Sequence, residues 1–315
     1  KIINIKVEEK PTGEIFAGAG TGTSGSTITA GIKEKNYFGK GISLNTNLTL
    51  SDDEIKGIFS AYNPNFRNTD RSLNTTLEST TSDFMTSSGY KTTRTGLKFG
   101  TGFEQYQDLF INFDISNYYE KLETSDKASA IKKKQEGDYF ENLFTYSLTT
   151  NKLDQNFQPT DGYRASFSQT LPIYSDDNSF ENRINVSKYH SLSDNLILSA
   201  KFFFKAINSL DDDVRVSKRV YIPGSRLRGF EAGKIGPKDG TQYVGGNYGS
   251  AVNLNTSLPN FFTEFENLDF SFFLDAANLW QVDYDSSLDS DKIRSSTGIS
   301  ANWFTPIGPL SFSYA

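Results

Sequence analysis

Few side chains in this sequence could carry out nucleophilic or acid–base chemistry. The 315 residues contain no cysteine and one histidine, His190. A thiol nucleophile, a cysteine-based zinc site and a disulfide framework are therefore excluded. His190 lies near a predicted turn and has no serine and carboxylate partners spaced as a hydrolase triad would need. We therefore expect no enzymatic activity, no cofactor and no metal ion.

Two runs of like charge could suggest ligand sites, but neither has the pattern of one. Asp211-Asp212-Asp213 lacks the spacing and the glycine of a calcium-binding loop, so we interpret it as a solvated external loop. Lys132-Lys133-Lys134 stands beside Glu136 and Asp138, and we predict a solvated loop there as well. The net charge of -6 and the isoelectric point near 5.1 argue against nucleic acid as a partner, because phosphate groups are neutralised by clustered lysine and arginine.

The composition is unusual for a soluble globular domain. Hydrophobic residues make up only 36% of the chain and the mean hydropathy is -0.50, yet aromatic residues reach 14%. Disordered chains are poor in aromatic residues, so disorder does not explain the low hydrophobicity. A wall one residue thick, with lipid on one side and water on the other, explains both values because half of each strand is then polar.

The recurring pattern along the chain is the two-residue alternation of a β-strand with two different faces. In one example, Leu268, Phe270, Phe272 and Leu274 alternate with Asp269, Ser271, Phe273 and Asp275. The alternation predicts strands near residues 13–22, 26–35, 41–51, 55–63, 72–86, 91–104, 109–122, 139–153, 162–174, 180–191, 195–207, 247–258, 268–280, 294–304 and 309–315. Helical periodicity is confined to a short segment around 125–135.

Short and long connections alternate between these strands. The long ones include about 123–138, 175–179, 208–246 and 281–292. This alternation is typical of a meander with short periplasmic turns and longer external loops. The sequence therefore predicts an all-β fold, a transmembrane antiparallel β-barrel. Because single-chain bacterial barrels normally have an even number of strands, we expect the sixteen-stranded type, with about fifteen strands present and the last one lacking.

Aromatic residues gather near the predicted strand ends, where such rings anchor a barrel at the membrane interface. The residues that we assign to this role are Tyr118, Tyr119, Tyr174, Phe180, Tyr189, Trp280 and Trp303. Sugar binding is not needed to explain them.

Several motifs occur in an order that is specific to one family. Asn36-Tyr37-Phe38-Gly39-Lys40-Gly41 marks a turn after the second predicted strand, and Arg226-Leu227-Arg228-Gly229-Phe230 lies in the longest connection. The motifs that follow are Ile235-Gly236-Pro237, Gly245-Gly246-Asn247 and Phe273-Leu274-Asp275. With these motifs, the sequence resembles the barrel of the BamA family of outer-membrane protein assembly factors over nearly its whole length.

The resemblance implies a division of the chain into two parts. Residues 1–12 would be the end of the last periplasmic POTRA module and its linker, and residues 13–315 the transmembrane β-barrel without its final strand. In the family, the first and last barrel strands form a weakly paired seam, a lateral gate through which client proteins enter the bilayer. The matching client-pairing edge here comprises Gly13, Glu14, Ile15, Phe16, Ala17, Gly18, Ala19 and Gly20. Glycine in a strand can also mark only a bulge or tight curvature, and this interpretation stays open.

The resemblance also makes the longest connection the sixth loop of the barrel, folded into the lumen. The Arg228 guanidinium has five fixed donors, which need acceptors inside a lumen. The family's Arg-Gly-Phe element, here Arg228, Gly229 and Phe230, implies a lock in which Arg228 pairs with Asp275. A glutamate that is common on the family's twelfth strand is replaced by Asn255, whose amide can still accept a hydrogen bond.

The resemblance implies an insertase of the bacterial outer membrane, which folds and inserts client β-barrel proteins with its strand-one edge as a template. The expected partners are unfolded outer-membrane proteins, accessory lipoproteins of the assembly machinery, and outer-membrane lipid and lipopolysaccharide. A polypeptide-secretion or translocation-and-assembly pore of the same superfamily is the alternative, because the Arg-Gly-Phe element is shared across it. A passive porin and an outer-membrane phospholipase or protease agree less well with the motifs.

Overall fold

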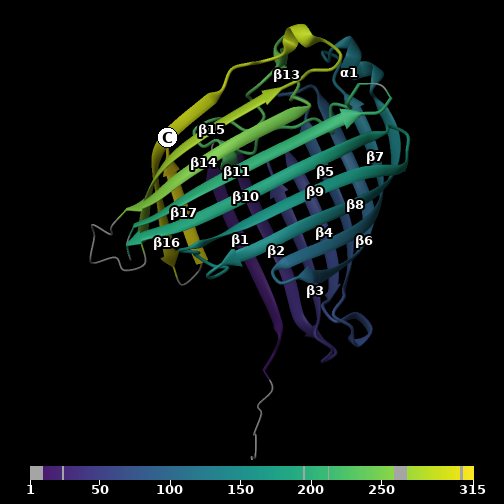
Figure 1. Ribbon diagram of the computed structural model, residues 1–315. Coiled ribbons are helices and arrows are strands. Elements are labelled where there is room, and N and C mark those ends of the chain that lie inside the picture. Colours follow the sequence, from purple (N-terminus) through teal and green to yellow (C-terminus); the bar gives the residue numbers. More distant parts are fainter. Residues whose placement is uncertain (1–9, 23–24, 194–195, 212, 259–267, 306–307) are drawn as a thin grey trace, which may run out of the picture.

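The computed structural model describes residues 10–22, 25–193, 196–211, 213–258, 268–305 and 308–315. In this part of the chain, fifteen antiparallel strands form a single sheet that curls into a barrel (Figure 1). The strands of the sheet pair in the order of the sequence, which is the predicted meander. The predictions of an all-β fold and of about fifteen strands are therefore confirmed.

The strands of the sheet have between seven and seventeen residues. They are β1 (Gly13–Gly22), β2 (Gly25–Tyr37), β3 (Ile42–Ser51), β4 (Glu54–Asn63), β5 (Ser72–Phe84), β6 (Tyr90–Tyr106), β7 (Leu109–Thr124), β8 (Gly137–Leu153), β9 (Gly162–Ser175), β10 (Ser179–Ser193), β11 (Leu196–Ser209), β14 (Tyr248–Leu258), β15 (Leu268–Trp280), β16 (Arg294–Thr305) and β17 (Gly308–Tyr314). The remaining elements are β12 (Lys238–Asp239), β13 (Gln242–Tyr243), α1 (Ala130–Lys134), η1 (Phe66–Asn68), η2 (Gly224–Arg226) and η3 (Ser286–Leu288). None of the helices in the described ranges is long and apolar enough to cross a membrane.

The alternation of side chains gives the barrel wall two different faces. On β15, Phe273, Asp275 and Ala277 are buried on the inner face. Phe272 and Leu274 lie on the outer face and keep 47% and 44% of their surface exposed. An apolar outer face and an inner face that admits charge are what a wall between lipid and a polar lumen requires.

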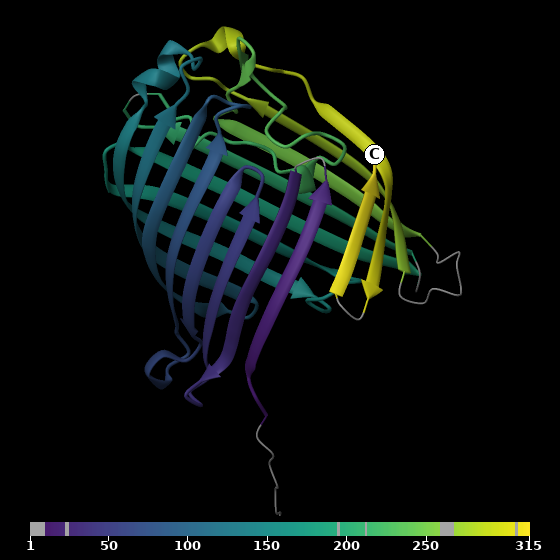
Figure 2. The same ribbon diagram turned by 180° about the vertical axis from the view of Figure 1, so that it is seen from behind.

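Loop six, the connection between β11 and β14, supplies the apolar core inside the barrel. Its side chains pack against the inner faces of β11, β14 and β15. The core cluster comprises Val214, Val220, Ile222, Leu227 and Ile235 of the loop and Phe203, Ile207, Ala251, Ala277 and Leu279 of the wall. The predicted folding of loop six into the lumen is therefore confirmed, and its green trace lies within the barrel in Figure 2.

The long connections gather at one end of the barrel, the upper end in Figure 1, where α1 lies near the β12–β13 hairpin. The prediction that the run at Lys132 is solvated was wrong for this residue. Lys132 is buried, and its Nζ donates to the carbonyl oxygen of Ser88 at 2.6 Å and to Oε1 of Gln242 at 3.0 Å. The sequence could not show this because Gln242 belongs to loop six, far along the chain. Burial lowers the pKa of Lys132 to about 8.

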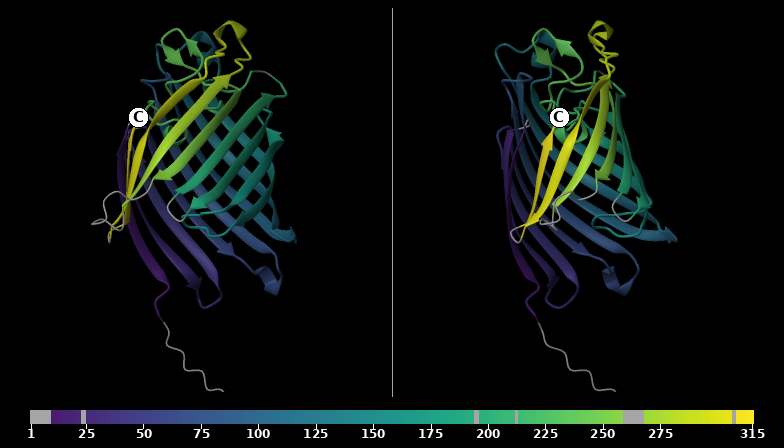
Figure 3. Two further views of the ribbon diagram at one scale, coloured as in Figure 1. Left: turned by 60° about the vertical axis from the view of Figure 1, so that its left-hand side comes forward. Right: turned by 90° about the vertical axis from the view of Figure 1, so that its left-hand side faces the viewer.

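Strands β1 and β17 are the two edges of the sheet and face each other around the barrel (Figures 2 and 3). No backbone pairing joins these two strands within the described residues. The sixteen-stranded type therefore stays a prediction. Most of the segment 1–12, assigned to a periplasmic module and linker, lies outside the described residues, and its last three residues lead into β1.

Two of the aromatic residues assigned to the membrane interface lie inside the barrel instead. Tyr118 of β7 is 8% exposed, and the Arg94 guanidinium lies 3.5 Å from the centroid of its ring. Tyr189 of β10 lines the lumen beside Lys201. The prediction was wrong for both because it used closeness to a strand end, whereas the alternation decides which face a ring occupies.

Candidate functional site

The Arg228 side chain of loop six binds both oxygens of one buried carboxylate on the barrel wall. Its Nε donates to Oδ2 of Asp275 at 2.7 Å, and its Nη2 donates to Oδ1 at 2.7 Å. The Arg228 backbone N–H also donates to Oδ2, at 3.1 Å. Asp275 is fully buried on the inner face of β15. A bidentate pair has a fixed orientation, so it holds the loop in one position on the wall.

Arg228 also contacts the strands on both sides of β15. Its Nη2 donates to Oδ1 of Asn255 on β14 at 2.9 Å, and its Nη1 donates to Oγ of Ser300 on β16 at 3.2 Å. The guanidinium carbon lies 3.6 Å from the ring centroid of Phe273. The amide of Asn255 thus accepts a hydrogen bond from Arg228, as the sequence predicted. One side chain therefore connects three adjacent strands, and we call this set of contacts the Arg228 anchor.

The two residues after Arg228 give the anchor its shape. Gly229 has a φ of 80°, a backbone conformation that residues other than glycine rarely adopt. A Cβ atom at this position would also lie 2.7 Å from the Cβ atom of Ala315. Phe230 packs against the loop-six core cluster. The three residues thus supply an ion pair, a turn and an apolar contact in succession.

The second predicted site, the strand-one edge, lies entirely in β1. Its members Gly13, Glu14, Ile15, Phe16, Ala17, Gly18, Ala19 and Gly20 each pair with a residue of β2. Within the described strands β1 has no neighbour on its other side, so one row of its N–H and C=O groups has no strand partner there. An unpaired row of this kind is a template for another strand.

The glycines of β1 are not explained by close packing. A Cβ atom at Gly18 or Gly20 would meet no other atom within 4 Å. Since no contact requires glycine at these positions, the main effect of glycine there is a weaker and more pliable strand. Gly31 of β2 is different, because a Cβ atom there would lie 2.5 Å from Cζ of Phe16. The ring of Phe16 therefore packs over a glycine on the neighbouring strand.

The structure does not bring the two predicted sites into contact with each other in the part of the chain that it describes. The Arg228 anchor binds β14, β15 and β16, whereas β1 pairs with β2. The element between the two sites is β17, which pairs with β16 and faces β1 (Figure 2).

The sequence matches a known domain over most of its length. The Omp85 superfamily domain matches residues 36–315. The chain belongs to the Omp85 superfamily.

Relatives of this Omp85 chain carry one common description. The chain is 26% identical over 323 residues to the outer membrane protein assembly factor BamA of Nitratidesulfovibrio vulgaris, with 99% of the chain and 40% of that protein covered. It is 24% identical to the protein of the same description from Neisseria meningitidis, with 99% of the chain and 45% of that protein covered. The chain therefore spans less than half the length of these relatives.

Solved structures show the same relationship. The crystal structure of BamA from Haemophilus ducreyi lacking POTRA domains 1–3 matches with a TM-score of 0.85 and 26% identity, over 98% of this chain and 67% of that one. CdiB from Acinetobacter baumannii matches with a TM-score of 0.52 and 12% identity, over 91% and 52% of the two chains, which shows the fold alone. With this family and these relatives, the chain is a protein of the bacterial outer membrane.

Loop six of this Omp85 barrel has a second ionic contact with the wall, which the sequence analysis missed. Arg215 is 2% exposed, and its Nη2 donates to Oε2 of Glu120 on β7 at 2.9 Å and to Oε1 of Glu141 on β8 at 2.7 Å. Its guanidinium carbon lies 3.9 Å from the ring centroid of Tyr139. Both carboxylates are buried as well, so Arg215 supplies the charge that makes their burial tolerable.

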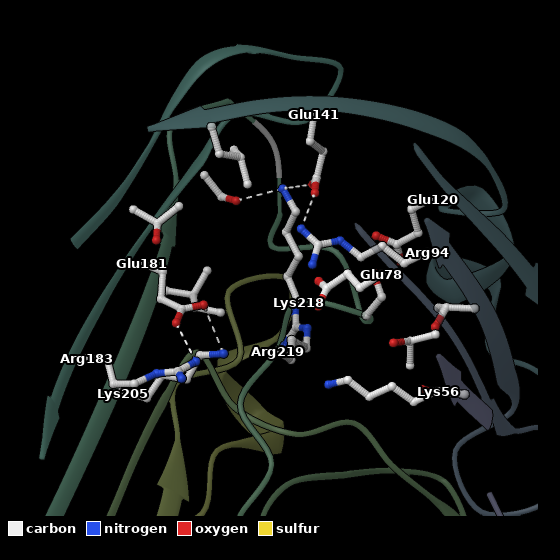
Figure 4. A pocket seen from close by; sticks show the side chains of 18 residues that line it. Lys56, Glu78, Arg94, Glu120, Glu141, Glu181, Arg183, Lys205, Lys218 and Arg219 are labelled. Carbon is white, nitrogen blue, oxygen red and sulfur yellow. Dashed lines mark hydrogen bonds and ion pairs between the residues drawn. The ribbon is translucent and has the colours of Figure 1, made fainter. Parts of the chain in front are cut away.

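Two further cations complete this contact, which we call the Arg215 anchor. Nζ of Lys218 lies 2.6 Å from Oε1 of Glu141 and 3.4 Å from Oδ2 of Asp177. Nη2 of Arg94 on β6 donates to Oε2 of Glu141 at 3.2 Å. Figure 4 shows Lys218 and Arg94 pointing toward Glu141 from the loop and from the wall. The Arg215 anchor is thus attached to β6, β7 and β8, whereas the Arg228 anchor is attached to β14, β15 and β16.

A third contact joins loop six to the connection between β15 and β16. Arg219 forms an ion pair with Asp283, whose Oδ2 also accepts from the backbone N–H of Val214 at 2.6 Å and from Nδ2 of Asn247 at 2.9 Å. Burial alone would raise the pKa of the Asp283 carboxyl. Arg219 and the two hydrogen bonds outweigh burial, and the pKa lies below its ordinary value.

This third contact predicts a dependence on acid. Because the pKa of Asp283 is lower in the folded protein, its stabilising effect is complete above the ordinary aspartate pKa of about 3.9 and is lost as the pH falls through the lower folded value. Limited proteolysis of loop six should therefore accelerate below about pH 4 in the native protein. In the Asp283→Asn variant, the protease should cleave loop six faster at neutral pH. Acidification should then accelerate the cleavage less than in the native protein. An unchanged acid profile in Asp283→Asn would contradict this assignment.

The sequence does contain a signal for these contacts. The stretch from Val214 to Arg228 has no carboxylate, and its cations are Arg215, Lys218, Arg219, Arg226 and Arg228. Four of these cations meet carboxylates, which are Glu120, Glu141, Asp177, Asp275 and Asp283, whereas Arg226 donates to Oδ1 of Asn185. A cationic loop inside a barrel predicts acidic partners on the inner face of the wall, but the partner of each cation depends on the path of the loop.

No group of three or more histidine, aspartate or glutamate side chains in the described ranges is arranged to hold a metal ion. The buried charged groups of the Arg228 and Arg215 anchors form ion pairs with one another instead. What this arrangement can do is mechanical: it fixes a loop inside a barrel whose two edge strands are not paired to each other in the described residues.

Proposed function

We propose that this chain is the barrel of an insertase, which folds and inserts other β-barrel proteins into the bacterial outer membrane. The observation that carries the proposal is the match to the barrel of BamA over 98% of the chain with a TM-score of 0.85. The match to CdiB is much weaker, at 0.52. The likeness extends to the sequence, since the relatives that carry the description of an assembly factor align over 99% of this chain.

The strand-one edge is the part of the barrel that would meet a client. A client strand would add to the free side of β1 through main-chain hydrogen bonds, which are independent of the client's sequence. Glycines that weaken β1 without being needed for packing allow it to separate from its surroundings and accept a new partner. The step needs no covalent chemistry, no cofactor and no nucleotide.

The height of the wall near β1 supports the same function. Strands β1, β3 and β4 each have ten residues and β2 has thirteen, whereas β6 and β8 have seventeen. At about 3.3 Å per residue, the wall beside the edge is built from strands of about 33–43 Å, against about 56 Å on the far side. A shorter wall favours a thinner bilayer at the edge, which lowers the barrier to inserting a new strand.

The partners follow from this role and belong to the same proposal. They are unfolded outer-membrane proteins at the β1 edge, accessory lipoproteins of the assembly machinery, and lipid and lipopolysaccharide around the outer face. A nucleic acid is not among them, because the chain carries a net charge of -6.

The experiment that tests the proposal is reconstitution of the full-length protein in liposomes, with the folding rate of an unfolded client barrel as the readout. The chain has no cysteine, so a pair of cysteines, one introduced in β1 and one in the final strand of the full-length barrel, can be oxidised without side reactions within this chain. Acceleration that disappears on oxidation and returns on reduction is the expected result. No acceleration, together with passage of an extended polypeptide, would overturn the proposal and favour a secretion pore.

The template mechanism predicts that proline and serine differ at Ala17. Ala17→Pro removes a backbone donor and restricts the strand, so the client folding rate should fall by about ten-fold or more. Ala17→Ser keeps the backbone donor and changes only a side chain on the outer face, so it should stay within about two-fold of the native rate. Equal rates for the two variants would show that the β1 backbone is not the template.

A further inference from the structure

The lumen contains a cavity of about 840 Å³ between loop six and the end of the barrel at which β1 begins. Its lining includes the β8–β9 connection, which the antiparallel strand order puts at that same end. Its charged lining residues are Arg164, Lys201, Arg226 and Arg228. No carboxylate lines it within the described residues, since Asp269 near this end accepts from Nε2 of Gln158 at 3.1 Å instead. We call this space the basic cavity.

Three of the four cations of the basic cavity have no counter-charge. Arg228 is neutralised by Asp275. Arg164 of β9, Lys201 of β11 and Arg226 of loop six form no ion pair with any carboxylate in the described part of the chain. The Arg215 anchor is different, because each of its cations meets a carboxylate. Unpaired positive charge is therefore concentrated in this one part of the lumen.

Arg226 is held in place although it lacks a counter-charge. Its Nη2 donates to Oδ1 of Asn185 on β10 at 3.1 Å, and its guanidinium carbon lies 5.2 Å from the ring centroid of Phe203. Burial lowers the pKa of Arg226, and no carboxylate offsets this effect. An anionic ligand would supply the missing counter-charge to a side chain that is already positioned.

The strand register sets the spacing of the three cations. Arg164 pairs with Ser187 of β10, and Ser187 pairs with Lys201 of β11. Arg164 and Lys201 therefore lie two strands apart on the same face, at a backbone separation of about 10 Å. Arg226 reaches the same face at Asn185, two residues along β10 from Ser187. The three charges thus surround one polar stretch of β10.

We propose that the basic cavity binds an acidic polypeptide segment in an extended conformation, which enters from the end of the barrel at which β1 begins. The inference goes beyond the proposed insertase function, because the site lies in the lumen and not at the strand-one edge. It can be tested without folding any client protein.

The spacing of the cations favours several linked carboxylates over one small anion. Guanidinium groups bind carboxylates in a bidentate geometry. In an extended chain, at about 3.3 Å per residue, side chains three positions apart are separated by about 10 Å. This value matches the separation of Arg164 and Lys201, which one small anion could not span.

The uncharged lining of the basic cavity suits a peptide backbone. It consists mainly of serine hydroxyls and asparagine amides, such as those of Ser199 and Asn255. A peptide that leaves water needs partners for its N–H and C=O groups, and amides and hydroxyls can both donate and accept. The apolar lining is limited to Leu153, Pro159 and the ring of Tyr189, so a lipid acyl chain would gain little there.

The test is the binding of labelled hexaglutamate to the full-length protein in nanodiscs of zwitterionic lipid, followed by fluorescence anisotropy. Hexaglutamate should bind, with an affinity that falls as salt is added, and hexaglutamine of the same length should not. Arg164→Gln and Lys201→Gln should each weaken binding by about three- to ten-fold, because each removes one charge-assisted contact. Neither side chain is buried, so both variants should fold.

Lys56 of β4 provides the matched control. It lines a separate lumenal cavity, which shares no lining residue with the basic cavity (Figure 4). Like Lys201, it has no ion pair with a carboxylate in the described residues. Lys56→Gln removes the same charge from the lumen, and it should change the affinity by less than about two-fold because the site lies elsewhere.

Several outcomes would overturn the inference. The absence of hexaglutamate binding is one, and equal binding of hexaglutamine is another. An equal loss of affinity in Lys56→Gln and Lys201→Gln would show that the peptide responds only to the overall charge of the lumen. Displacement by an equal concentration of inorganic phosphate would assign the cavity to small anions. Loss of peptide binding in nanodiscs of anionic lipid would assign it to a lipid headgroup. Failure of the insertase assay would leave all of these outcomes unaffected.

Discussion

Arg228→Ala should destabilise the barrel by about 3–5 kcal/mol, because it leaves a fully buried carboxylate without its counter-charge. Asp275 is completely buried and receives three hydrogen bonds from Arg228. Of these, only the one from the backbone N–H could survive, and only while the loop stays in place. The loss of free energy of unfolding can be measured from urea denaturation in lipid, with protease cleavage in loop six as a second readout.

A second substitution separates the buried charge from the loss of contacts. Asp275→Asn in the Arg228→Ala background removes the unpaired charge, so it should restore part of the lost stability while loop six stays cleavable. Native stability in Arg228→Ala, or a double variant less stable than the single one, would count against the ionic character of the anchor. The proposed function adds that Arg228→Ala should lose insertase activity.

Arg215→Ala should have an effect of similar size, again about 3–5 kcal/mol, at the opposite side of the loop. Glu120 and Glu141 are 3% and 1% exposed and would lose the guanidinium that lies between them. Lys218 and Arg94 remain beside Glu141, so Glu120 should be the carboxylate that loses most of its counter-charge. The same denaturation measurement applies.

Arg164 provides the matched control for Arg215. It is an exposed arginine of β9 that lines the lumen, and Arg164→Ala should change the free energy of unfolding by no more than about 0.5 kcal/mol. Restored stability when Glu120→Gln is added to Arg215→Ala would confirm that the unpaired carboxylate is the cause. Equal effects of Arg215→Ala and Arg164→Ala would refute the anchor.

The two anchors share no side chain, so their effects should be nearly additive. Loop six is then bound to β6–β8 on one side of the lumen and to β14–β16 on the other.

The sequence by itself determined the strands of this protein and much of its first anchor. Alternation with a period of two follows from local backbone geometry, so it fixes where strands lie without any knowledge of their partners. All fifteen predicted segments correspond to strands of the sheet. The resemblance of the Arg-Gly-Phe element to a known family placed Arg228 opposite Asp275 and Asn255, and the structure has these residues in contact.

Only the tertiary structure decided which residues lie together across the lumen. Arg215 and Glu120 are 95 positions apart and belong to a loop and a strand whose distance depends on the curvature of the whole sheet. The burial of Lys132 and the inward position of Tyr118 have the same origin, because a run of charge or a strand end does not reveal what covers it. The bond from Ser300 to Ser313 depends on the register between two strands, and a shift of one residue would place the two hydroxyls on opposite faces of the sheet.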